Sequence, residues 1–199
     1  MATTERLSTA VAQNIAGQIA ERLPAAMGPA AAPGAAGPAL GETLKIRLLP
    51  LNQIVNGSGP LETRLSDTGQ WHHQVYQGEQ AVSFARSTAP GSGSDAAHEV
   101  VEVAQSTLPD DLRDAIAWID ANAPEDAEAS LIAAPDYFLT AVWLRGPAVD
   151  AVVIASMADG LTKLSKRRLI PSAEFLQSLA ESTPVRGLGP IADQAGGAP

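Results

Sequence analysis

The spacing of hydrophobic and polar positions divides the chain into a leading helix and a strand-rich body. In residues 3–23 an aliphatic side chain recurs every four positions, which predicts an amphipathic helix with one narrow apolar stripe. Thr3 or Thr4 is expected to cap the start of this helix, and Pro24 is expected to end it. The stripe consists of Leu7, Val11, Ile15, Ile19 and Leu23.

Residues 24–41 have the composition of a linker. They contain four prolines, four glycines and no charged side chain. Such a segment cannot sustain a helix or a strand ladder, because proline lacks the backbone donor and glycine adds chain entropy. As a flexible chain it would reach on the order of 25 Å. The sequence therefore predicts a helix at residues 1–23 that is tethered to a domain at residues 42–182, with a disordered tail at 183–199.

Alternation with a period of two predicts that the domain is rich in strands. Residues 44–48 alternate as a half-buried strand, and a hairpin is expected at residues 71–86 around Gln77-Gly78-Glu79. A further strand is expected over 98–105. Short turns between later apolar runs predict an antiparallel meander with strands at 129–134, 137–144 and 149–155.

Two helices are expected to pack on this sheet. Residues 109–122 carry Pro109 at the first helical position, acidic residues in the first turn and an apolar face of period 3.6. A short helix should follow Ser172, which is expected to cap it. The predicted fold class is α+β: a mainly antiparallel sheet of about six to seven strands with two packed helices, preceded by the tethered amphipathic helix.

Composition narrows the classes of function. The chain has 199 residues, no cysteine and a net charge of −9. Without cysteine, disulfides, thiolate nucleophiles and zinc–thiolate sites are excluded. The acidic balance disfavours nucleic acid as a partner. Neither a secretory signal nor a membrane-spanning run is apparent, so we expect a cytoplasmic protein with no membrane partner. The abundance of Ala, Gly and Pro is typical of GC-rich bacterial coding sequences.

Three histidines are the candidates for catalytic chemistry. His72 and His73 are adjacent, so in a strand they point to opposite faces and cannot share one metal ion. A site that combines His73, His98 and a carboxylate remains an alternative, with Asp67, Asp95 or Asp136 as the third member. Purely structural roles for these strand histidines are favoured over this site.

No other motif indicates a specific reaction. Phosphate-binding loops, nucleotide-binding glycine patterns, a serine nucleophile elbow and clustered metal-binding acids are absent, so we expect no cofactor and no metal. One basic cluster could contact an acidic partner, a phosphate or RNA, although a solvated loop is favoured because no aromatic residue interleaves it. It comprises Lys163, Lys166, Arg167 and Arg168.

The tethered helix is the strongest functional indication. Its apolar stripe requires a partner surface, and a long uncharged linker suits docking on another molecule better than packing on its own domain. The sequence therefore favours a non-catalytic protein-interaction or accessory module, whose N-terminal helix docks on a protein partner or self-associates as a homo-oligomer. The alternative is a small hydrolase or small-molecule-binding protein that uses a His/Asp site.

Overall fold

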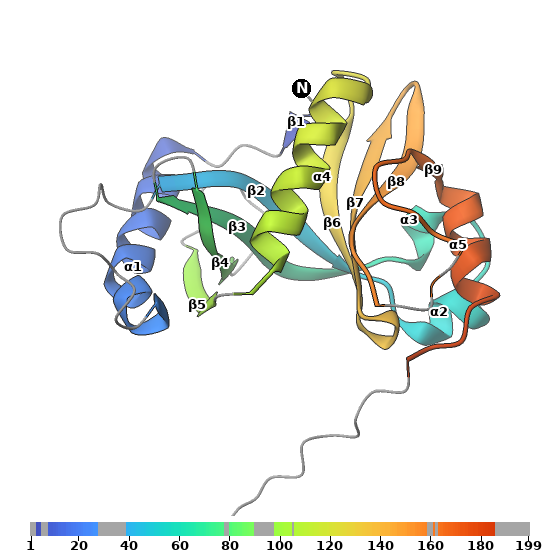
Figure 1. Ribbon diagram of the computed structural model, residues 1–199, viewed down its shortest axis with the longest axis horizontal. Helices are drawn as coiled ribbons and strands as arrows, with labels where there is room; N and C mark the ends of the chain where they lie inside the picture. Colours follow the sequence, from blue (N-terminus) through green and yellow to red (C-terminus); the bar gives the residue numbers. More distant parts are fainter. Residues whose placement is uncertain are drawn as a thin grey trace, which may run out of the picture.

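The protein is built around one mixed β-sheet (Figure 1). The computed structural model describes residues 3–4, 8–27, 39–77, 80–89, 98–104, 106–158, 161 and 163–185. Eight strands run in the order β5-β4-β3-β2-β6-β7-β8-β9, and the short β1 pairs with β6 outside this path. The strands are β1 (Thr3–Thr4), β2 (Ala39–Leu48), β3 (Ser66–Gln77), β4 (Gln80–Thr88), β5 (Glu99–Ala104), β6 (Glu128–Ala134), β7 (Leu139–Gly146), β8 (Val149–Ser156) and β9 (Ile170–Pro171).

The α+β class is confirmed, with slightly more strands than predicted. Five α-helices and one 3₁₀ turn accompany the sheet in the described part of the chain: α1 (Thr9–Met27), α2 (Leu51–Val55), α3 (Leu61–Arg64), α4 (Leu108–Asn122), η2 (Pro135–Tyr137) and α5 (Ser172–Ala180). The short helices α2 and α3 were missed by the sequence pattern. Pro50 and Pro60 immediately precede them, and a proline placed before a helix favours its start as readily as it breaks a strand.

A parallel pair at the centre joins two antiparallel halves. The hairpin β3–β4 and the meander β6–β7–β8 form as predicted. The chain then places β2 against β6 in parallel, with Ile46 opposite Leu131. This contact connects residues more than eighty positions apart, so local alternation alone could not predict it.

Helices cover the two faces of the sheet unequally (Figure 1). The helix α4 packs on one face, where Leu112, Ala115 and Ile119 meet the apolar side chains of β2, β6, β7 and β8. On the other face α1 covers β3, β4 and β5, while α2, α3 and α5 cover the far end over β6, β7 and β8. The strand β3 therefore lies beneath α1 on one side and close to the start of α4 on the other. None of the described helices is long and apolar enough to cross a membrane.

The N-terminal helix starts and ends later than the pattern suggests. It begins at Thr9, and the Ser8 hydroxyl accepts a hydrogen bond from the Val11 amide at 3.4 Å, so Ser8 takes the capping role expected of Thr3 or Thr4. Those two threonines form β1 instead. Pro24 lies inside the last turns, and the helix continues to Met27. Of the expected linker, the first four residues are helical and the last three belong to β2, while residues 28–38 lie outside the described part, as do residues 186–199.

Candidate functional site

The apolar stripe of α1 is covered by the chain's own sheet. Val11, Ile15, Ile19 and Leu23 are 9 %, 0 %, 1 % and 7 % exposed. They pack with Val75, Ala85 and Val100, contributed by β3, β4 and β5. The side chain of Leu7, the fifth predicted stripe residue, lies outside the described part. In this structure the helix thus returns to its own domain, the arrangement that the linker made less expected.

Polar side chains of α1 complete the outer edge of β5. The Gln18 side-chain amide donates to the His98 carbonyl at 2.9 Å, and its oxygen accepts from the Val100 amide at 2.9 Å. The Arg22 guanidinium donates to the Val100 carbonyl. Unpaired backbone groups at a sheet edge are a template for association with another strand. Gln18 occupies them as a neighbouring peptide unit would, so α1 caps this edge.

Beneath α1, the polar side chains of four residues form a chain of hydrogen bonds. The Ser87 hydroxyl lies 2.8 Å from His73 Nε2 and 2.9 Å from His98 Nδ1. The Thr43 hydroxyl lies 3.1 Å from His73 Nδ1. Register explains the grouping, because Thr43 and Ala85 flank His73 across the sheet and Ser87 is opposite Trp71 on the same face. The structure therefore brings His73 and His98 together through Ser87.

This chain of hydrogen bonds can form with neutral imidazoles in either of two directions. Each hydroxyl donates one hydrogen bond, so every donor points from Thr43 through His73 and Ser87 toward His98, or every donor points the opposite way. Burial lowers the pKa of His73 to about 3, with further lowering by the neighbouring His72 and His98. Burial also lowers the pKa of His98. The Ser87 hydroxyl between His73 and His98 has the arrangement of a nucleophile beside a general base, and the described residues supply no further member of such a site.

His72 points to the opposite face, as predicted from strand geometry. Its ring stacks on Phe84 with centroids 5.3 Å apart, and neither ring nitrogen makes a hydrogen bond of normal geometry to a described residue. Burial lowers the pKa of His72 to about 4, with Arg86 adding to the shift and Gln74 opposing it. The neighbouring Gln74 amide donates to the Pro109 carbonyl at the start of α4 at 2.7 Å. All three histidines are thus buried, because helices cover both sides of this part of the sheet.

None of the expected carboxylates joins the histidines within the described residues. Asp67 pairs with Lys45 at 2.6 Å near the start of β3. Asp136 lies in η2, between β6 and β7, and two strands separate β7 from β3 in the sheet. Asp95 lies outside the described part. Nor does any group of three or more His, Asp or Glu side chains in the described ranges come close enough to hold a metal ion.

The basic cluster is neutralised by ion pairs. Each of its four side chains contacts an acidic residue. These acidic residues lie in α4, in α5 or directly after α5. Exposed pairs of this kind contribute about 0–1 kcal/mol each to stability, and they leave little free positive charge for phosphate. The pairs are Lys163–Glu181, Lys166–Asp111 at 2.7 Å, Arg167–Asp114 at 3.9 Å and Arg168–Glu174 at 2.9 Å.

Two tryptophans have polar or aromatic partners within the fold. The Trp71 ring meets His98 edge to face, with centroids 5.7 Å apart. The Trp143 indole donates to Asp150 Oδ1 at 2.8 Å. The Ser172 hydroxyl donates to the same oxygen instead of capping α5, which Pro171 precedes. The N–H of the buried Trp143 indole thus has its hydrogen-bond partner within the fold.

The sequence pattern does not indicate Gln18, Thr43 or Ser87 as members of this site. All three are small or neutral polar residues at positions that alternation alone assigns to a helix flank or a strand face. A comparison of the hairpin register could have placed Ser87 on the face of His73, but the return of α1 could not be inferred from spacing. The chain matches no family model, no curated protein and no solved structure.

Proposed function

We propose that the chain is a protein-interaction module in which α1 and the sheet face beneath it form a docking pair that can operate between two copies. The observation that carries the proposal is the set of contacts from Gln18 and Arg22 to the β5 edge, beside the buried Ile15 and Ile19. These contacts between α1 and the sheet are noncovalent. A second copy can therefore supply the same helix to the same surface.

The length of the segment between α1 and β2 decides whether α1 packs on its own chain or on a second copy. Full burial of an aliphatic side chain contributes about 1.5–3 kcal/mol, so the four stripe residues provide a binding energy on the order of 10 kcal/mol before ordering costs. A short flexible tether presents its own helix at an effective concentration in the millimolar range. With the native segment 28–38, closure within one chain should therefore predominate in dilute solution, and exchange should grow as concentration approaches that range.

Shortening the segment between α1 and β2 tests the proposal. Deleting residues 29–37 leaves two residues between Met27 and Ala39, a span of at most about 11 Å. We expect this variant to form a dimer that exchanges α1, as measured by light scattering coupled to gel filtration. A matched control replaces residues 29–37 with nine Gly/Ser residues, preserves the length and should remain monomeric at the same concentration.

A second substitution separates exchange from unspecific association. Ile15→Asp places an unpaired charge at a fully buried position of the stripe. Combining this substitution with the deletion should therefore dissociate the dimer into monomers. The proposal is wrong if the deletion variant remains monomeric at all concentrations and folds as the control does. It is also wrong if the dimer persists with Ile15→Asp.

The alternative of a small hydrolase rests on Ser87 between His73 and His98. In this structure Ser87 is fully buried, so α1 would have to move before a substrate could approach. A fluorophosphonate probe should then label Ser87 in the wild-type chain and more rapidly in Ile15→Ala, which loosens α1, and should not label Ser87→Ala. The absence of labelling in both Ser87-containing chains would exclude this alternative.

A further inference from the structure

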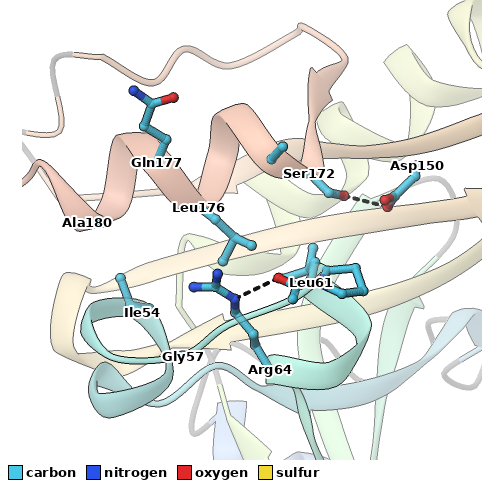
Figure 2. A pocket seen from close by; sticks show the side chains of 12 residues that line it. Ile54, Gly57, Leu61, Arg64, Asp150, Ser172, Leu176, Gln177 and Ala180 are labelled. Carbon is cyan, nitrogen blue, oxygen red and sulfur yellow. Dashed lines mark hydrogen bonds between the residues drawn. The ribbon is translucent and has the colours of Figure 1, made fainter.

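A cleft of about 440 Å³ opens among α2, α3 and α5 (Figure 2). These helices lie at the end of the molecule opposite α1 (Figure 1). The cleft lies between α2 and α3 on one side and α5 on the other. Ile54, Leu61 and Leu176 supply apolar lining, and Arg64 and Asp150 supply charges of opposite sign. This volume falls within the range typical of sites for small molecules. Neither the helix docking nor the histidine chain involves these residues.

Arg64 is held in place by backbone carbonyls. Its Nε donates to the Gly59 carbonyl and its Nη1 to the Gln53 carbonyl, both at 3.1 Å. Figure 2 shows the guanidinium on the cleft side of α3, with Leu176 extending toward it from α5. Two fixed donors restrict the rotamers of the side chain. The guanidinium is therefore positioned before any ligand arrives, which lowers the entropy cost of binding.

The charge of Arg64 has no carboxylate partner among the described residues. Ion pairs to Asp or Glu engage eight of the eleven Lys and Arg side chains in the described part, and Arg64 shares the lack of such a pair with Arg22 and Arg47. In a chain of net charge −9, acidic side chains are in excess, so an unpaired guanidinium in a cleft is conspicuous. Planar guanidinium groups recognise carboxylates through paired N–H donors, and Nη2 of Arg64 makes no hydrogen bond within the described part.

Asp150 limits the kind of anion that the cleft can accept. Its Oδ1 accepts hydrogen bonds from Trp143 and Ser172, so the carboxylate is fixed at the cleft wall. A second negative charge on the ligand would be repelled there. The apolar side chains between these two charged groups suit a hydrocarbon body.

We propose that this cleft binds a small monocarboxylate with an apolar body, with its carboxylate on Arg64 and its hydrocarbon part against Leu61 and Leu176. The free carboxylic acid and the C-terminal carboxylate of a peptide share this chemistry. The proposal does not depend on the exchange of α1, since the two surfaces lie at opposite ends of the sheet.

Titration of the full-length chain with octanoate, followed by amide chemical shifts, tests the site. We expect saturable shifts at Leu176 and Gln177, with octylamine producing none at the same concentrations. N-acetyl-leucyl-leucine and its C-terminal amide form a second pair, and only the acid should bind. The tighter of octanoate and the dipeptide acid indicates which source of the carboxylate the cleft prefers.

Two variants distinguish recognition by Arg64 from general apolar binding. Arg64→Gln should weaken octanoate binding by at least about tenfold, because it removes a charge-assisted hydrogen bond, while Arg113→Gln at a surface ion pair should leave it unchanged. Ala173→Phe should fill the cleft and abolish binding while leaving Arg64 intact. The proposal is overturned if octanoate causes no saturable shifts, if octylamine binds equally well, or if Arg64→Gln binds as tightly as wild type.

Discussion

Acidification should destabilise the fold through its buried histidines well above the pH at which carboxylates titrate. His72 and His73 are fully buried, and burial lowers their pKa values to about 4 and about 3. In the unfolded chain both return to about 6.5. Between these values the unfolded state binds more protons than the folded state. The free energy of unfolding is therefore highest above pH 6.5 and falls as pH drops through 6.5 toward 4.

The size of the effect follows from these pKa values. For a group that stays neutral in the fold and has an unfolded pKa of about 6.5, lowering the pH from 7 to 5 costs about 2 kcal/mol. His72 and His73 together should therefore remove about 4 kcal/mol, a large part of the 5–15 kcal/mol typical of a domain. His98, whose pKa is also lowered, acts in the same direction.

Urea unfolding at a series of pH values measures this dependence. Near pH 5 the slope of the free energy of unfolding should approach about 2–3 kcal/mol per pH unit from His72 and His73. Asp67 and Glu181 have lowered pKa values. Their contributions to the free energy of unfolding are lost only below about pH 4.5, so they do not affect its change between pH 7 and 5.

His72→Phe gives the matched variant. It keeps an aromatic ring against Phe84 and removes a proton site whose nitrogens make no normal hydrogen bond to a described residue. The variant should lose about half of the slope and gain stability at pH 5 relative to wild type. The buried neutral histidines do not govern acid stability if the free energy of unfolding of the wild type changes by less than about 1 kcal/mol between pH 7 and 5, or if His72→Phe leaves the slope unchanged.

Three further predictions concern α1 and an exposed turn. Ile19→Ala should lower the free energy of unfolding by about 2–4 kcal/mol, whereas Gln13→Ala on the exposed side of α1 should change it by less than about 0.5 kcal/mol in the same urea titrations. Gln18→Ala should accelerate hydrogen exchange of the Val100 amide, and unchanged exchange would contradict the capping of the β5 edge. Phe138 is 57 % exposed and has a φ of 43°, so Phe138→Gly should raise the melting temperature, and a lower value would show that the ring makes a contact of importance to the fold.

Local sequence patterns were sufficient for most of the sheet. The meander β6–β7–β8 was predictable because each strand alternates or is continuously apolar and the connections are short. The hairpin β3–β4 was predictable for the same reason. The short helices α2 and α3 were not, because four or five residues are too few to establish a period of 3.6.

The candidate sites depended on long-range geometry to a much greater extent. Spacing correctly placed His72 and His73 on opposite faces of a strand. It could not show that His98, on a different strand, reaches His73 through Ser87, since this requires the registers of β3, β4 and β5 together. Likewise, Arg64 of α3 and Asp150 of β8 line one cleft only because α3 packs over this end of the sheet.

The sequence by itself determined the α+β class, the amphipathic stripe of α1 and the absence of cysteine chemistry. These properties depend on side-chain type and on spacing within a few turns or strands. Only the tertiary structure decided where the stripe of α1 is buried and which polar groups lie beneath it. An apolar helical stripe has the same free energy of burial against any surface of matching shape, so its partner is set by the complete sheet, with Gln18 meeting the open edge of β5.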